Sequence, residues 1–137
     1  MKIEAGPWRE HGAVQLGPDG KLKMPDPGRG PGIYRFRLTG GVATSVYIGE
    51  SEDISRRFGQ YRNPESSQRT NIRVHKWMSE RIEAGGTLEV AVVSQAELRV
   101  GESHEPLDLG RRTSRLLVEE HLLDEARQAG ETVVNLS

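Results

Sequence analysis

Cysteine is absent from this chain of 137 residues, which excludes disulfides, thiol catalysis and zinc sites built on cysteine. A chain without cysteine fits a reducing cytoplasm, where we expect it to act. Long apolar runs are also missing, because no stretch approaches the roughly 20 residues that a membrane span needs. The N-terminus, MKIEAGPWRE, has no apolar signal-peptide core. We therefore expect no association with a membrane.

A strong net charge is missing too: 19 basic and 20 acidic residues leave the chain at −1, which argues against a generic nucleic-acid binder. The charges are unevenly distributed, however. Residues 56–81 contain seven basic and two acidic side chains, whereas residues 97–108 contain four acidic and one basic. A basic patch on a nearly neutral protein can follow phosphates, although solvated helix surfaces explain the same pattern equally well.

The first 32 residues contain seven glycines and five prolines, a density that excludes helix. Within them, residues 13–16 and 21–24 predict a small hairpin around a Gly-Pro-Asp-Gly turn. We interpret residues 1–30 as an extension packed on a single domain formed by residues 31–137. No internal repeat or linker divides the chain further.

Two strands joined by a tight turn are predicted next. Apolar side chains alternate along residues 32–38 and again along residues 46–48, and Thr-Gly-Gly follows the first run. Each strand carries one tyrosine, Tyr34 on the first and Tyr47 on the second. The pattern therefore predicts an antiparallel hairpin with a tyrosine on each strand.

A helix is predicted over residues 53–61, with Ser51 as its N-cap. At 100° per residue, Arg57 borders the apolar stripe of this helix, whereas Arg56 points away from it. An arginine at the inner margin needs an anionic partner, in the protein or in a ligand, because burial of an unpaired charge is costly.

The middle of the chain predicts a second helix, from Thr70 or Asn71 to the glycines that follow Ala84, and then a central strand at residues 87–93. The methionine and tryptophan of this helix lie on its apolar stripe and read as core. Residues 94–111 are polar and read as irregular. His104 lies there among acidic side chains, and an exposed loop explains this cluster better than a metal site does.

The last helix is predicted over residues 113–128. On a helical wheel one arc gathers Leu116, Leu122, Leu123 and Ala126. Glu119 lies in the middle of that arc, where a carboxylate costs several kcal/mol unless it is paired or bound to a metal. Two interpretations remain open: a structural salt bridge to Arg57, or a metal ligand. Residues 132–136 predict a short extended segment.

Taken together, these motifs resemble the GIY-YIG endonuclease family. Its two signatures stand as GIY at residues 32–34 and YIG at residues 47–49. The family places an arginine eight residues after the second signature, which is Arg57 here. It places a glutamate in a later leucine-rich helix, and Glu119 within LLVEEHLL occupies that position. Asn135 matches a C-terminal asparagine of the family.

The resemblance covers residues 31–137 and implies an α/β fold. In this fold a small three-stranded sheet with an antiparallel hairpin is flanked by helices. In this chain, the N-terminal extension would be added to that domain. One departure stands beside the second signature, because Glu50 occupies a position where several family members carry a lysine.

The resemblance also implies a function, the metal-dependent hydrolysis of DNA phosphodiester bonds by an endonuclease. Glu119 would hold a single Mg²⁺, for which Mn²⁺ can substitute. Arg57 would clamp a phosphate oxygen. Tyr34 would orient or deprotonate the attacking water, and Tyr47 would hydrogen-bond to the same phosphate or water.

We expect DNA to be the partner and a further set of side chains to contact it. This set is Gly49, Ser51, Arg56, Tyr61, Arg62, Arg73, Lys76 and Asn135. No separate recognition domain is visible, so a homodimer or a partner protein would supply DNA recognition. Two alternatives remain open: a catalytically inactive module that binds nucleic acid, and a protein-interaction domain in which Arg57 and Glu119 form a structural pair.

Overall fold

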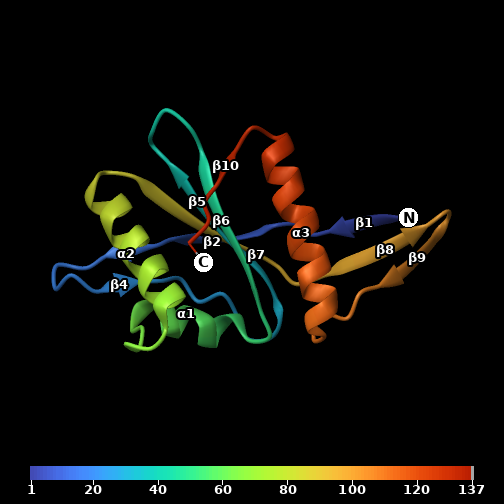
Figure 1. Cartoon of the computed structure of the whole chain (residues 1–137), viewed down its shortest axis with the longest axis horizontal. Coiled ribbons are helices and arrows are strands. Elements are labelled where there is room, and N and C mark those ends of the chain that lie inside the picture. The colour runs from blue at the N-terminus through green and yellow to red at the C-terminus, as the bar shows by residue number, and fades with distance from the viewer. Residues whose placement is uncertain (137) are drawn as a thin grey trace.

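The computed structural model describes residues 1–136, which form three helices and ten strands (Figure 1). The helices are α1 (Ile54–Arg62), α2 (Arg69–Glu83) and α3 (Arg112–Gln128). The strands are β1 (Lys2–Ala5), β2 (Arg9–Ala13), β3 (Gln15–Leu16), β4 (Leu22–Lys23), β5 (Gly32–Thr39), β6 (Ser45–Ser51), β7 (Thr87–Val93), β8 (Ala96–Val100), β9 (Ser103–Pro106) and β10 (Thr132–Val133). In this part of the chain, no helix is both long and apolar enough to cross a bilayer.

The central sheet has five strands in the order β10-β6-β5-β7-β2, two more than the three expected. The predicted hairpin is the antiparallel pair β5–β6, and β5 also pairs antiparallel with β7. The two further strands come from the ends of the chain. β2 pairs antiparallel with β7, and β10 pairs parallel with β6. Pairing between segments so distant in sequence has no local pattern that would reveal it.

Helices cover both faces of this sheet (Figure 1). Alternation along β5 sends Tyr34 and Phe36 to one face and Ile33 to the other. α1 and α2 pack on the first face, where Phe58 is fully buried against the tyrosine. α3 packs on the second face through residues such as Val118. Two hydrophobic clusters therefore lie on opposite sides of β5 and β6.

The outer edge of β6 is open over most of its length. β10 pairs only with Ser45 and Val46, and one more backbone hydrogen bond, from Val134 N–H to the Val46 carbonyl, extends the pairing. Beyond it, no backbone hydrogen bond from residues 1–136 reaches this edge between residues 47 and 51. Side chains from both faces of the sheet can therefore meet around this edge.

The N-terminal segment and residues 94–111 contribute to further pairing. β3 and β4 form the predicted small hairpin. The expectation that residues 94–111 are irregular is wrong, because β8 and β9 form an antiparallel hairpin and β1 pairs with β8. The resulting three-stranded sheet extends away from the helices α1 and α2 (Figure 1). Segments of the first 30 residues thus belong to both larger sheets.

Two local predictions need correction. The N-cap of α1 is Asp53, whose carboxylate accepts the backbone N–H of Arg56 at 3.4 Å. Ser51 instead lies buried at the end of β6, where its hydroxyl bonds the backbone of Asp53. The buried face of α3 is also rotated from the predicted arc. Leu116 is exposed, and the buried residues are Arg115, Val118, Leu122 and Ala126.

Candidate functional site

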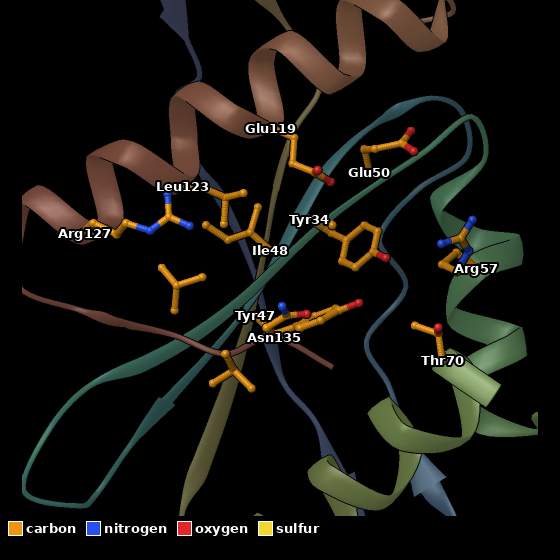
Figure 2. A pocket seen from close by; sticks show the side chains of 13 residues that line it. Tyr34, Tyr47, Ile48, Glu50, Arg57, Thr70, Glu119, Leu123, Arg127 and Asn135 are labelled. Carbon is orange, nitrogen blue, oxygen red and sulfur yellow. The ribbon is translucent and has the colours of Figure 1, made fainter. Parts of the chain in front are cut away.

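A cavity of about 380 Å³ opens at the free edge of β6 (Figure 2). Its lining includes Tyr34, Tyr47, Gly49, Arg57, Glu119 and Asn135. These residues come from β5, β6, α1, α3 and the segment after β10, so the cavity draws on both faces of the sheet. The structure thus brings together both signature tyrosines, the arginine and the glutamate that the sequence analysis singled out.

Tyr34 is held as a buried neutral phenol. Its side chain is almost fully buried, and its hydroxyl forms a hydrogen bond with the hydroxyl of Tyr61. Burial raises the pKa of both tyrosines above their ordinary value. Tyr61 has no exposed surface and does not line the cavity, so the expectation that it contacts substrate is corrected: it positions Tyr34.

Gly49 faces Tyr34 directly across the β5–β6 pair. The tyrosine ring lies over the glycine, so that a Cβ at residue 49 would overlap the hydroxyl of Tyr34 and would lie 2.5 Å from its Cζ. Only a residue without a side chain leaves room for the ring in this position. The second signature therefore needs a glycine at this position, because any side chain there would overlap the tyrosine of the first signature.

We expect Gly49→Ala to lower the free energy of unfolding by about 1–3 kcal/mol, because overpacking displaces the Tyr34 ring from its contact with Tyr61. Urea unfolding measures the change. Gly41→Ala is the matched control, since a Cβ there meets only the Ala43 carbonyl, at 3.9 Å, and should change stability by less than about 0.5 kcal/mol. Equal stability of the two variants would contradict this steric account.

Arg57 and Arg56 differ in their placement as the helical wheel predicted. Arg57 is half-buried and lines the cavity, where the hydroxyls of Tyr34 and Tyr61 face its guanidinium. Arg56 is exposed and does not line the cavity; it lines a smaller hollow at the start of α1, which Arg57 also lines. Within residues 1–136, Arg57 has no carboxylate within ion-pair distance. Its charge is therefore available to an anionic ligand.

Glu119 is half-buried and projects from α3 toward the same space as Tyr34 (Figure 2). Burial, together with the nearby carboxylates of Glu50 and Glu120, raises the pKa of Glu119 to about 7. The alternative of a salt bridge to Arg57 is not what the structure shows, since no cation of residues 1–136 lies within ion-pair distance of this carboxylate. The site therefore holds a carboxylate that lacks a positive partner.

Glu50, whose charge beside Tyr47 the sequence left unexplained, pairs with Arg115. The Arg115 Nε donates to Glu50 Oε2 at 2.6 Å, and its Nη1 donates to the backbone carbonyls of Leu109 and Gly110. Sequence analysis missed Arg115. A signal was present in the spacing: the buried residues Val118 and Leu122 lie three and seven positions after Arg115, on the same face of α3. This signal is easily overlooked, because arginine is usually counted as a polar surface residue.

The other predicted contact residues are dispersed. Asn135 lines the cavity and also an adjoining hollow, which Arg73 and Lys76 line on α2. Arg62 is exposed beside the loop that precedes β5. The cavity also includes Thr70 at the start of α2 and Arg127 of α3, neither of which the sequence analysis singled out.

A second group of possible metal ligands lies on the outlying sheet, where Glu4, Glu97 and His104 approach one another. The structure already partners these residues, because His104 Nδ1 lies 3.1 Å from Glu97 and Arg99 lies 3.4 Å from Glu4. The acidic side chain that His104 contacts, Glu97, belongs to the neighbouring strand β8. Among residues 1–136, Glu119 thus differs from this group, because it lines the cavity and has no cation within ion-pair distance.

The fold is similar to that of a solved structure of bacteriophage T4 EndoII, an endonuclease studied there as a glutamate-to-alanine mutant. The two share 13% sequence identity with a TM-score of 0.58, and the alignment covers 85% of this chain and 88% of that chain. At this level of identity the similarity shows the fold alone. No protein-family model and no curated protein sequence matches the chain. The chain thus shares its mixed α/β fold with a nuclease.

Proposed function

We propose that this chain is a metal-dependent DNA endonuclease of the GIY-YIG type. One observation carries the proposal: Glu119 and Arg57 line the same cavity, and within residues 1–136 neither has an oppositely charged side chain at ion-pair distance. A phosphate with a bound divalent cation supplies both missing charges. The two signature tyrosines lie in the same cavity, and the fold similarity to an endonuclease supports the same interpretation.

The residues of the cavity fit Mg²⁺. This ion binds carboxylate oxygen and retains several waters, so it needs one or two protein ligands and space for its hydration shell. Glu119 provides the carboxylate, and the cavity provides the space. Glu50 is nearby but is engaged by Arg115, which leaves Glu119 as the ligand. When bound, Mg²⁺ supplies charge neutralisation at the phosphate and at the leaving oxygen.

The roles of the other residues follow from their charge and burial. Arg57 binds a nonbridging phosphate oxygen through its guanidinium and stabilises negative charge that develops during hydrolysis. Because burial raises the pKa of Tyr34 and of Tyr47, both hydroxyls keep their protons at neutral pH. We assign Tyr34 to orienting the attacking water by hydrogen bonding, and Tyr47 to contacting the same phosphate.

The experiment that tests the function compares two adjacent arginines. Supercoiled plasmid and branched duplex DNA are incubated with Mg²⁺ and wild type, Arg57→Gln or Arg56→Gln. We expect Arg57→Gln to lower kcat/KM about 100-fold, as loss of a charge-stabilising donor does. Arg56→Gln removes an equally charged side chain outside the cavity and should cost less than about tenfold, because solvent screens its charge.

The two alternatives give different results. A module that binds nucleic acid without cutting would bind these DNA substrates but leave them intact. A protein-interaction domain would neither bind nor cut them. Cleavage that falls equally in both arginine variants would point to general electrostatic binding and would contradict the assignment of Arg57 to the scissile phosphate.

A further inference from the structure

A second hollow, of about 420 Å³, adjoins the cavity. It is lined by Arg73, Lys76, Trp77, Glu80, Asn135 and Leu136. Asn135 lines both spaces, and the ring of Tyr47, which lines the cavity, packs against Trp77 at a centroid distance of 6.4 Å. The cavity and the second hollow therefore lie next to each other, with Asn135 in the lining of both.

One face of α2 runs along both spaces. Thr70 lines the cavity, whereas Arg73 and Trp77 line the second hollow. These residues are spaced by three and four positions, so they lie on the same face of the helix. From Thr70 to Trp77 the helix rises about 10 Å. A strand of nucleic acid whose phosphate occupies the cavity would therefore reach the second hollow with a neighbouring nucleotide.

The chemistry of the second hollow suits such a nucleotide. Trp77 is partly buried: it packs against the hydrophobic cluster beneath α2 and also lines the second hollow, so it is an aromatic side chain of the kind on which bases stack. Arg73 is exposed and has no ion-pair partner within residues 1–136. Lys76 is 75% exposed, and its contact with Glu80 is long, at 3.8 Å. The second hollow thus combines an aromatic ring with two cationic side chains that form no close ion pair within residues 1–136.

We propose that the second hollow binds the base of a nucleotide next to the scissile phosphate, with the base stacked on Trp77 and its phosphate at Arg73 and Lys76. This inference rests on the proposed nuclease function and deepens it. A base reaches Trp77 only when it is not paired within a continuous duplex. The preferred substrate is therefore DNA with unpaired nucleotides beside the cleavage site, such as a flap, a branch or a single strand.

Fluorescence provides the test, because the chain has two tryptophans. Trp8 lies at another place in the fold, under the Arg35 guanidinium, so Trp8→Phe leaves Trp77 as the reporter. In the full chain, Trp8→Phe is combined with Glu119→Gln to prevent cutting. The probes are a short single-stranded oligonucleotide, the same strand with abasic sites, and a continuous duplex of the same sequence.

We expect the single strand to quench Trp77 and to bind about tenfold more tightly than its abasic counterpart. The duplex should leave the fluorescence nearly unchanged. Arg73→Gln should lower the slope of log affinity against log salt by about one. Equal binding of intact and abasic strands, or equal quenching by strand and duplex, would overturn the proposal. Neither result would affect the cleavage assay that compares Arg57→Gln with Arg56→Gln, and that assay tests the nuclease function independently.

Discussion

Glu119→Gln is expected to reduce DNA cleavage at least about 1000-fold, because it removes the carboxylate proposed to hold the metal and with it several kcal/mol of charge stabilisation. Glutamine keeps the size of the side chain, so the fold should persist. Cleavage of plasmid and branched DNA under saturating Mg²⁺ measures the effect. A variant that retains more than about a tenth of the wild-type rate would contradict the assignment of Glu119.

The same variant should lose activity but, in the absence of metal, gain stability against unfolding. The folded protein raises the pKa of Glu119 to about 7 from its ordinary value of 4.5, so ionisation of this carboxyl disfavours the folded state. Below about pH 4.5 the carboxyl is protonated in both states and has no such effect. The destabilisation grows as the pH rises toward 7 and is complete above it.

In chelated buffer at pH 8, we therefore expect Glu119→Gln to be more stable than wild type by about 1 kcal/mol. This value is well below what the pKa shift alone implies, because the carboxylate is only half-buried and solvent screens its charge. Urea unfolding at pH 5 and pH 8 measures the difference. Loss of stability at pH 8 would instead indicate a structural partner for Glu119.

Two further measurements connect these effects with the metal. Addition of Mg²⁺ should raise the Tm of wild type and leave that of Glu119→Gln unchanged, since a ligand stabilises only the state that binds it. Glu120→Gln is the matched control, because Glu120 is the exposed neighbour on α3 and does not line the cavity. This control should retain cleavage and the response to Mg²⁺.

Arg115→Met is expected to produce the largest loss of stability, about 3–5 kcal/mol at neutral pH. The Arg115 and Glu50 side chains are only 6% and 17% exposed, so removal of the arginine leaves a carboxylate buried without its cation. The same change leaves the carbonyls of Leu109 and Gly110 without a donor. Urea unfolding of the full chain measures the difference.

Two variants separate loss of the ion pair from loss of packing. Addition of Glu50→Gln to Arg115→Met removes the unpaired charge and should recover part of the lost stability. Arg127→Met removes an exposed arginine of the same helix, whose contact with Asp124 is 3.3 Å, and should cost less than about 1 kcal/mol. A double variant no more stable than Arg115→Met would show that packing, and not the ion pair, dominates at this place.

Much of the fold was readable from the sequence because it depends on local periodicity. The hairpin β5–β6, the three helices and β7 all lie close to their predicted ranges. The helical wheel also distinguished Arg57 from Arg56, since a helix of known register fixes which side chain faces the sheet. The resemblance to the GIY-YIG family identified Tyr34, Tyr47 and Glu119, and all three line one cavity.

The errors of prediction share a physical cause, which is pairing between distant segments. No local pattern shows that β2 and β10 complete the sheet or that β1 pairs with β8. The predicted arc of α3 was correct for Leu122 and Ala126, which are buried, but it included Leu116, which is exposed, and left out Arg115, which is buried. Arginine is buried there only because Glu50, 65 residues earlier, neutralises it.

By itself, then, the sequence determined the local elements and most of the residue types that line the cavity. The tertiary structure determined how these elements pair and how their side chains lie relative to one another. β10 pairs with β6 over only two residues, so the rest of that edge stays open and side chains from both faces of the sheet meet there. Arg115 pairs with Glu50, whereas Glu119, which lines the same cavity as Arg57, has no ion-pair partner within residues 1–136. Each of these relations depends on contacts between distant residues, which only the folded chain brings together.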